Sequence, residues 1–221
     1  MPRLIAIGDI HGCSKTLHAL LWHKIGIKKS DTLVFIGDYI DRGPDSKGVV
    51  DQIISLRNDG FTVFALRGNH EQLLLDSRNG PLQRQAWMVN GGGMTLNSYG
   101  ISGVDELDLM HFDFFSNTIF FLELENFIFA HAGLNFSRQK PLEDFTAMLW
   151  IRDFKIKRRW LLKRILVHGH TPMSFDQIIA QPFEAAIDID GGCVYHDKPA
   201  LGNLFAADLT NRVFISQPYC E

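Results

Sequence analysis

Cysteine is scarce in this chain of 221 residues, which contains only Cys13, Cys193 and Cys220. An odd number of widely spaced thiols does not predict a disulfide framework and is typical of a reducing compartment. No apolar run reaches the ~18 residues of a membrane-spanning helix. The first predicted strand begins near Arg3, and no charged segment with a cleavable apolar stretch precedes it. We therefore expect a cytoplasmic protein without a membrane partner.

A strong excess of charge of either sign is also absent. Lys and Arg number 22 against 25 Asp and Glu, which gives a formal net charge of −3. Such a chain has no general attraction for nucleic acid or anionic lipid, so we expect neither as a partner, and an anionic substrate must be held by a local positive site. The hydrophobic content of 46% is enough to bury a full core. Because no linker, repeat or low-complexity tract interrupts the chain, we expect a single domain over residues 1–221.

The first third of the chain alternates between apolar runs and helical patterns. The runs at 3–8, 33–36 and 61–66 predict buried strands, and the apolar spacing at 17–21 and 49–56 predicts helices between them. This βαβαβ pattern favours a parallel sheet with right-handed crossovers, in which ligands gather outside the carboxyl ends of the strands.

The rest of the chain predicts a helical segment followed by more strands. Residues 72–118 contain the turn Asn79-Gly80-Pro81 and the run Gly91-Gly92-Gly93, and we interpret them as a helical insertion over the site. Later strand patterns, with a β-rich ending, predict a second sheet packed on the first. They cover residues 119–124, 127–130, 166–167, 187–190, 205–209 and 213–215. The predicted fold class is therefore α/β.

Polar residues with metal-binding chemistry follow five of these predicted strands. An Asp before a turn is usually a cap, but several such residues at separate strand ends predict one shared site. They are Asp9, His11, Asp38, Asn69, His131 and His170. Carboxylate, amide and imidazole groups suit hard or borderline divalent ions, and the lack of cysteine among them argues against structural zinc. Two ions ~3.5–4 Å apart need a shared carboxylate, for which Asp38 is the natural candidate.

Asp41, Arg42 and His70 lie beside these ligands and can act on a phosphate. The planar fork of Arg42 suits bidentate contact with phosphate, and a structural salt bridge is the alternative. A carboxylate at Asp41 would make protonated His70 a proton donor to a leaving alkoxide, and a purely structural loop histidine is the alternative. Coordination lowers the pKa of water from about 15.7 toward about 7, so the predicted nucleophile is a metal-bound hydroxide and no covalent phosphoenzyme is needed.

At these residues the chain resembles the metal-dependent phosphoprotein phosphatases of the PPP type. The resemblance is to the short bacterial and phage forms, of which the bacteriophage lambda protein phosphatase is typical, and it spans roughly residues 4–192. It rests on the blocks GDIHG, GDYIDRG and RGNHE in this order and spacing, with HAG and HGHTP further along. It implies a metallophosphoesterase fold, with a central β-sandwich of two mixed sheets flanked by helices.

The resemblance also implies the roles of the site residues. One metal would be held by Asp9, His11 and Asp38, and the other by Asp38, Asn69, His131 and His170. Phosphate would contact Arg42 and Asn69, with Arg152 as a match to the family's second phosphate-binding arginine. Asp41 and His70 would be the proton-donating pair. The two divalent metals are commonly manganese in bacterial members, with iron or zinc as alternatives. The implied activity is that of a protein serine/threonine phosphatase, with phosphotyrosine or small phosphomonoesters as further substrates.

The chain departs from the wider pattern in two places. The histidine before Thr-Pro is His170, so His168 is not expected to be a ligand, and Pro172 replaces the second histidine of the Gly-His-x-His ending found in broader metallophosphoesterases. The first metal should therefore depend more on water and on its remaining ligands. From Cys193 onward the segment no longer aligns, and the role of residues 193–221 stays open.

Two alternative functions stay open. The blocks GDIHGC and RGPDS also resemble bacterial diadenosine tetraphosphatases, which share this core. The symmetrical enzymes of that group tend to lack the pair Asp41-Arg42, which favours phosphomonoesters here but does not exclude asymmetrical cleavage. A non-catalytic phosphoprotein-binding module would have lost a ligand or the proton donor, and every one of these positions is intact.

Two further features have alternative interpretations. The stretch from Arg152 to Arg164 contains seven Lys and Arg residues against one acid, Asp153. It is either a docking surface for acidic phosphopeptides or a partner, or a solvated helix face. Trp87 and Tyr99, near the glycine run, either stack on a substrate ring or are buried in the helical insertion.

Overall fold

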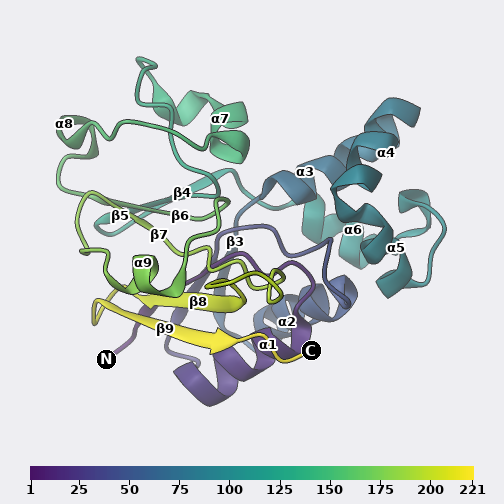
Figure 1. Cartoon of the computed structure of the whole chain (residues 1–221), viewed down its shortest axis with the longest axis horizontal. Helices are drawn as coiled ribbons and strands as arrows, with labels where there is room; N and C mark the ends of the chain where they lie inside the picture. Colours follow the sequence, from purple (N-terminus) through teal and green to yellow (C-terminus); the bar gives the residue numbers. More distant parts are fainter.

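Two β-sheets packed face to face form the centre of the computed structural model, which describes all 221 residues (Figure 1). The five-stranded sheet has the order β3-β2-β1-β8-β9, and the four-stranded sheet has the order β4-β5-β6-β7. The strands are β1 Leu4–Ile7, β2 Thr32–Phe35, β3 Thr62–Ala65, β4 Phe121–Leu124, β5 Phe127–Ala130, β6 Ile165–His168, β7 Ala186–Asp188, β8 Asn203–Asp208 and β9 Val213–Pro218. Parallel and antiparallel pairs occur in both sheets, which confirms the predicted fold class of two mixed sheets flanked by helices.

Helices cover the outer faces of this sandwich. The first sheet is covered by α1 Ser14–His18, its π-helical continuation η1 Ala19–Ile25, and α2 Ser46–Asn58. The second sheet is covered by α7 Phe145–Trp150 and α8 Arg158–Leu161, and the short helices η5 Pro141–Glu143 and α9 Phe175–Ile179 complete this half. None of the helices combines the length and apolarity needed to cross a bilayer.

The hydrophobic core lies in three layers that follow this arrangement. Between the sheets, Ala6 and Val34 pack in one cluster with Phe129 and Val167. On the outer face of the first sheet, the alternate residues of the same strands pack against the helices in a cluster of 27 buried residues. Because strands β1 and β2 are buried on both faces, their sequences are continuous apolar runs rather than alternating ones.

The last two strands occupy a different place from the one that the sequence predicted. Strand β7 joins the second sheet, but β8 and β9 return to the first sheet, where β8 pairs antiparallel with β1. The open edge of β1 accepts them, since β2 occupies only its other edge. The chain therefore crosses between the sheets after β7, and this crossing carries residues 189–202 past the site.

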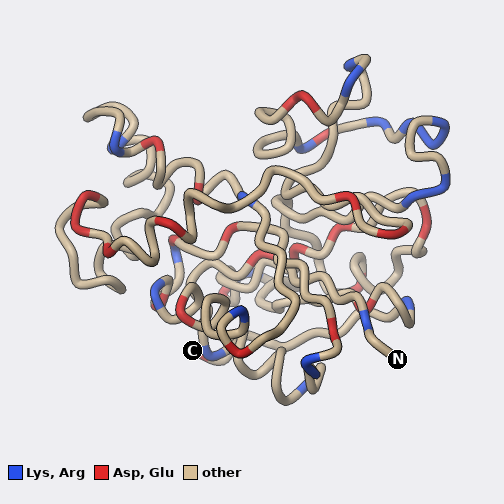
Figure 2. The backbone as a smooth tube through the Cα atoms, turned by 180° about the vertical axis from the view of Figure 1, so that it is seen from behind, with Lys and Arg blue, Asp and Glu red and all other residues tan.

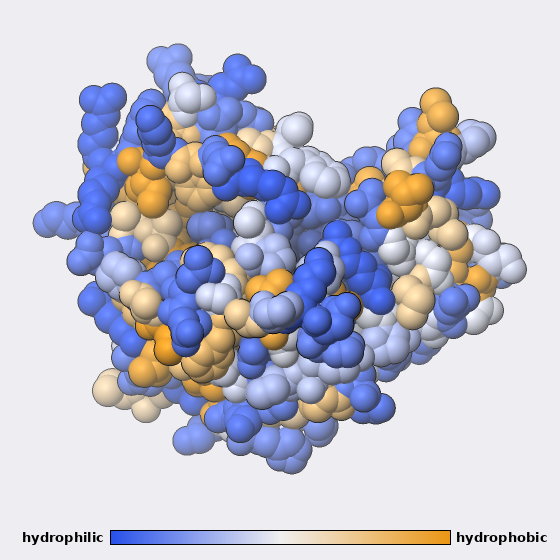
Figure 3. Space-filling model, in the orientation of Figure 1, coloured by the Kyte–Doolittle hydropathy of each residue, from blue (hydrophilic) through white to orange (hydrophobic).

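Residues 69–116 form a helical lobe at one side of the first sheet (Figure 1). Its elements are α3 Asn69–Asp76, η2 Ser77–Asn79, α4 Pro81–Trp87, η3 Met88–Gly92, α5 Gly93–Tyr99, η4 Val104–Glu106 and α6 Leu109–Ser116. That this segment is an insertion into a shorter unit stays a prediction. The space-filling view shows a hollow between this lobe and the rest of the molecule (Figure 3).

Candidate metal centre

The candidate ligands lie on loops that leave the carboxyl ends of the strands. Five of the ten non-glycine residues with positive φ belong to the predicted site, namely His11, Asp38, Asp41, Arg42 and His170. Each such conformation costs on the order of 1–3 kcal/mol and persists only where the surrounding structure fixes it. Backbone strain is therefore concentrated at the residues to which the sequence assigned chemistry.

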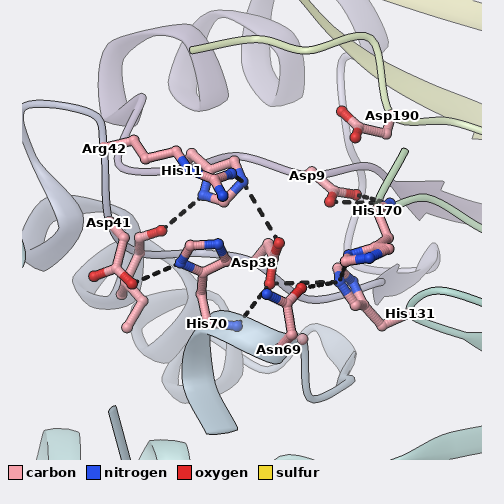
Figure 4. A network of polar contacts seen from close by, with 12 residues as sticks. Asp9, His11, Asp38, Asp41, Arg42, Asn69, His70, His131, His170 and Asp190 are labelled. Carbon is pink, nitrogen blue, oxygen red and sulfur yellow. Dashed lines mark hydrogen bonds and ion pairs between the residues drawn. The ribbon is translucent and has the colours of Figure 1, made fainter. Parts of the chain in front are cut away.

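Two imidazoles have a fixed tautomer that leaves a lone pair facing Asp38. The Nδ1 atom of His11 lies 2.9 Å from the carbonyl oxygen of Ile40, and Nδ1 of His131 lies 3.0 Å from that of Ile36. Because a carbonyl only accepts, each Nδ1 donates and each Nε2 carries the lone pair. These Nε2 atoms lie 3.5 Å from different carboxylate oxygens of Asp38 (Figure 4).

The acceptor atoms of His131, Asp38 and Asn69 converge beside His170. The Nε2 atom of His131 also lies 3.0 Å from Oδ1 of Asn69 and 3.2 Å from Nδ1 of His170. Burial lowers the pKa of His11, His131 and His170, the last to about 3, so all three are neutral ligands at neutral pH. Convergent lone pairs repel one another unless a cation lies between them, and imidazoles held through Nδ1 are typical of metal sites. The residues therefore fit divalent metal ions.

Asp38 divides the centre into two overlapping groups of donor atoms. His11, Asp38 and His70 form one group and Asp38, His131 and His170 the other, with the atoms of each group within 4.8 Å of one another. This is the shared-carboxylate arrangement predicted for two ions. The structure adds His70 to the first group, although the sequence assigned it only to proton donation.

Asp9 lies beside these groups rather than in them. Its carboxylate accepts the backbone N–H of His170 at 3.1 Å. Burial, together with the charges of Asp190 and Asp38, raises the pKa of Asp9 well above its usual range. This crowding of buried carboxylates is a further feature that divalent cations would offset.

His70, the predicted proton donor, has a buried carboxylate partner and lines a cavity next to this centre. Nδ1 of His70 lies 2.7 Å from Oδ2 of Asp41, and both side chains are fully buried. Burial alone would lower the pKa of His70, but Asp38 and the hydrogen bond to Asp41 outweigh it and raise the pKa. Nε2 of His70 is buried without a hydrogen-bond partner. This nitrogen is therefore free to contact a substrate atom in the cavity.

Cationic side chains line a cavity of about 280 Å³ above these residues. Nη1 of Arg42 lies 2.7 Å from Nε2 of His11, and Nη1 of Arg152 lies 3.3 Å from the hydroxyl oxygen of Thr171. Lys198 is a third, and its Nζ lies 4.2 Å from the centre of the Tyr195 ring. Arg42, Arg152 and Lys198 form no ion pair with a carboxylate. They are therefore available to bind an anion, and the salt-bridge alternative for Arg42 does not hold.

Sequence reasoning missed two acidic residues of the site. Asp190 follows β7, lies 3% exposed and lines the cavity, and burial raises its pKa to about 7. Glu71 is fully buried, and its carboxylate accepts the backbone N–H groups of Asp38, Tyr39 and Gly68 at 2.8–2.9 Å. Glu71 thereby ties the Asp38 loop to α3. Glu71 stood in the block RGNHE and Asp190 in the predicted strand 187–190, but neither was assigned a role.

The aromatic residues of the helical lobe do not line the cavity. Trp87 is 1% exposed, and its indole N–H donates to the carboxylate of Asp41 at 3.0 and 3.1 Å. The ring of Tyr99 lies 5.2 Å from that of His111. Neither ring is placed to stack on a substrate in this cavity.

The basic stretch 152–164 extends away from the centre, and only Arg152 reaches the cavity. Arg158 pairs with Glu184 at 3.0 Å, and Arg164 pairs with Glu123. Figure 2 shows the remaining basic residues along an outer arm of the molecule. Lys155, Lys157 and Arg159 are exposed, so this stretch leaves several cations unneutralised.

Comparisons with known proteins place this site in a family. The family model described as calcineurin-like phosphoesterase matches residues 2–214. Serine/threonine-protein phosphatase 1 of Salmonella typhimurium is 45% identical over 86 residues, which are 39% of this chain and 37% of that protein. The asymmetrical bis(5'-nucleosyl)-tetraphosphatase PrpE of Oceanobacillus iheyensis is 28% identical over 220 residues, 87% of this chain and 84% of that protein. A cold-active protein-tyrosine phosphatase from a psychrophilic Shewanella shares the fold with a TM-score of 0.70 at 16% identity, over 100% of this chain and 81% of that chain.

Proposed function

Because this chain belongs to the calcineurin-like phosphoesterase family of metal-dependent hydrolases, we propose that it removes phosphate from phosphoserine or phosphothreonine in proteins. The buried pair of Asp41 and His70, with Nε2 of His70 unpartnered beside the cavity, carries this proposal. An alkoxide is a poor leaving group and needs a proton as it departs, whereas a phosphate leaving from a polyphosphate does not. The presence of the pair Asp41 and His70 therefore favours a phosphomonoester of an alcohol as the substrate.

The proposed metal ligands are those that the sequence predicted, which include Asp9 beside the two groups of donor atoms. Asp9, His11 and Asp38 would hold one ion, and Asp38, Asn69, His131 and His170 would hold the other. We propose manganese as the metal, with iron or zinc as alternatives. When bound, the two ions would neutralise the phosphoryl oxygens and lower the pKa of the attacking water.

The protein side chains would bind the phosphate and supply a proton to the leaving oxygen. Arg42 and Arg152, which both line the cavity and form no ion pair with a carboxylate, would bind phosphoryl oxygens together with the amide of Asn69. His70 would hold a proton on Nε2 and donate it to the leaving oxygen as the P–O bond breaks. Asp41, which accepts from Nδ1 at 2.7 Å, would hold the imidazole in that orientation.

A second candidate is asymmetrical hydrolysis of a dinucleoside polyphosphate. The observation that favours it is the extent of similarity, because the alignment with the Oceanobacillus tetraphosphatase covers 87% of this chain against 39% for the Salmonella phosphatase. Lys198 on the rim of the cavity would suit a further phosphate group.

A direct comparison of substrates tests the proposal. We expect the manganese-loaded protein to have a higher kcat/KM on a phosphoserine peptide than on diadenosine tetraphosphate, and to lose both activities in a chelator. The variant His70→Asn should lose more activity on the peptide than on the tetraphosphate, because only the first leaving group needs a proton. Preference for the dinucleotide would move the function to nucleotide turnover. Inactivity on both with metal bound would contradict both candidates.

A further inference from the structure

The helical lobe contacts Asp41 through two buried side chains, Trp87 and Thr95. The indole N–H of Trp87, at the end of α4, is shared between the two carboxylate oxygens of Asp41 at 3.1 and 3.0 Å. The hydroxyl of Thr95, in α5, donates to Oδ1 of the same carboxylate at 2.6 Å. With Nδ1 of His70 at 2.7 Å from Oδ2, this carboxylate has three donors, one from α3 and the other two from α4 and α5.

The same contacts fix the backbone of the loop. Asp41 and Arg42 have φ values of 71° and 69°, two successive left-handed residues that are not glycine. The backbone N–H of Asp41 donates to the hydroxyls of Ser46 at 3.1 Å and Thr95 at 3.0 Å. A strained conformation of this kind is kept only when its surroundings determine it. Thr95 therefore holds both the backbone and the side chain of Asp41.

The glycine run explains how the lobe comes close enough to make these contacts. A Cβ atom at Gly91, where φ is 107°, would lie 2.9 Å from the backbone nitrogen of Arg42, and a Cβ at Gly92 would lie 2.6 Å from ring atoms of Trp87. Both approaches are closer than side chains tolerate. Gly91 and Gly92 thus let the lobe pack on the Arg42 loop and on the indole that contacts Asp41.

We propose that Trp87 and Thr95 are positioning residues for the proton donor. By fixing the carboxylate of Asp41 they fix the imidazole of His70, so that its Nε2 faces the leaving oxygen. The inference rests on the proposed role of His70 but not on the identity of the natural substrate. It assigns the segment 81–99 a part in catalysis although no residue of it supplies a ligand or a proton.

The test uses aryl phosphates that differ only in their leaving group. Thr95→Val removes the hydroxyl at nearly constant volume, and Trp87→Phe removes the indole N–H. We expect each to lower kcat on phenyl phosphate roughly 10-fold, a part of the 10²–10⁴-fold that a general acid contributes, with a several-fold smaller loss on 4-nitrophenyl phosphate and little change in KM. Thr95→Ser keeps the hydroxyl and should restore most of the rate.

Two controls separate positioning from general loss of stability. Thr118 is a buried threonine in the same half of the chain; its hydroxyl donates to the carbonyl of Phe115 at 2.6 Å and accepts from Nε of Arg67 at 2.9 Å, and it has no hydrogen bond to Asp41 or His70. Thr118→Val should lower the melting temperature by an amount similar to Thr95→Val and leave both kcat values unchanged. The indole resonance of Trp87 in a ¹H–¹⁵N spectrum should shift in Asp41→Asn, as expected for a donor to that carboxylate.

A double-mutant cycle decides between the outcomes. In a His70→Asn background, Thr95→Val should cause no further loss on phenyl phosphate, because both changes disable one function. Independent losses in that background, equal losses on the two substrates, or failure of Thr95→Ser to recover would overturn the positioning role. If His70→Asn itself shows no dependence on the leaving group, the proposed proton donor is wrong, and the positioning role falls with it.

Discussion

Asp38 is the residue on which the centre depends most, because its two carboxylate oxygens face different imidazoles at 3.5 Å. We expect Asp38→Asn to lose bound metal and at least 100-fold in kcat, since an amide cannot supply two anionic oxygens to two ions. Metal content by atomic spectrometry after dialysis, measured beside kcat, checks this. Asp176→Asn, an exposed acid on α9, is the matched control and should change neither. A variant at position 38 that keeps both metal and activity would end the bridging assignment.

The predicted grouping of the candidate ligands came from one physical rule. Polar residues that follow parallel strands lie at the same edge of the sheet, where the carboxyl ends of the strands meet. That rule brought together Asp38, Asn69 and His131 from strands β2, β3 and β5. Asp190 obeys the same rule after β7, but the sequence extended this strand over residues 187–190 and so placed Asp190 inside it, whereas the strand ends at Asp188. The contact of Trp87 with Asp41 follows no local rule, because 46 positions separate the two residues and only the packing of the lobe joins them.

Asp31 stabilises the chain at a point far from the metal centre. Its carboxylate is 1% exposed. It accepts hydrogen bonds from Nη2 and Nε of Arg3 at 2.5 and 3.2 Å, and from the backbone N–H of Lys28 at 2.8 Å. Burial opposes ionisation, but these donors outweigh it and lower the pKa of Asp31. A lowered pKa contributes stability above the unfolded value of about 3.9 and loses it as the pH falls through the folded value.

We therefore expect Asp31→Asn to lower the free energy of unfolding by about 1–3 kcal/mol near neutral pH, and by less as the pH is lowered toward the acid range. Urea unfolding of variant and parent at matched pH values measures this difference. Asp105→Asn removes a carboxylate that is 60% exposed and paired only at the surface, and its effect should be close to zero. A destabilisation by Asp31→Asn that stays constant down to acid pH would contradict the ionic account.

At the scale of elements, burial of the strands explains which of them could be predicted from the sequence. Strands β1, β2, β5 and β6 are buried on both faces, so their apolar runs were visible without any partner. The strand with which each of them pairs could not be predicted from the sequence. The pairing of β8 with β1 brings together residues about 200 positions apart, and the π-helical form of η1 arises within a helix whose apolar spacing predicts only a helix. Local patterns determine the elements, whereas sheet order depends on contacts that no local pattern encodes.

Helix α2 depends on a cap that also joins two other helices. The carboxylate of Asp45 accepts the backbone N–H of Gly48 at 2.9 Å and the hydroxyls of Ser14 at 2.6 Å and Ser98 at 3.2 Å. Asp45→Ala should lower the free energy of unfolding by about 1–2 kcal/mol, which corresponds to about 2–8 °C in Tm at this chain length. Asp45→Asn keeps an acceptor for the cap and should lose less. Thermal melts followed by circular dichroism decide this, and equal losses in the two variants would show that the cap is not the stabilising contact.

At the scale of the whole molecule, the net charge of −3 conceals an uneven distribution. The stretch 152–164 carries seven cations against one acid, and it begins at Arg152 in the wall of the cavity. Lys155, Lys157 and Arg159 are exposed and form no ion pair, so their electrostatic field extends into solvent. A positive arm that begins at a cavity lined by Arg42, Arg152 and Lys198 is suited to steer acidic substrates toward that cavity.

A charge reversal in this arm, residues 152–164, distinguishes a docking surface from a solvated helix face. Reversing Lys155, Lys157 and Arg159 to Glu should lower kcat/KM on an acidic phosphopeptide roughly 10-fold at low ionic strength, because steering acts on the association rate. Turnover of 4-nitrophenyl phosphate should stay the same, and added salt should erase the difference, since screening shortens the reach of surface charge. Reversing Lys24, Lys28 and Lys29, which are exposed around the end of η1, makes the same change in net charge and should leave the peptide activity intact. If both triple variants lose activity equally, net charge alone is responsible and the arm is a solvated face; if only the first does, the arm is where an acidic substrate first meets the protein.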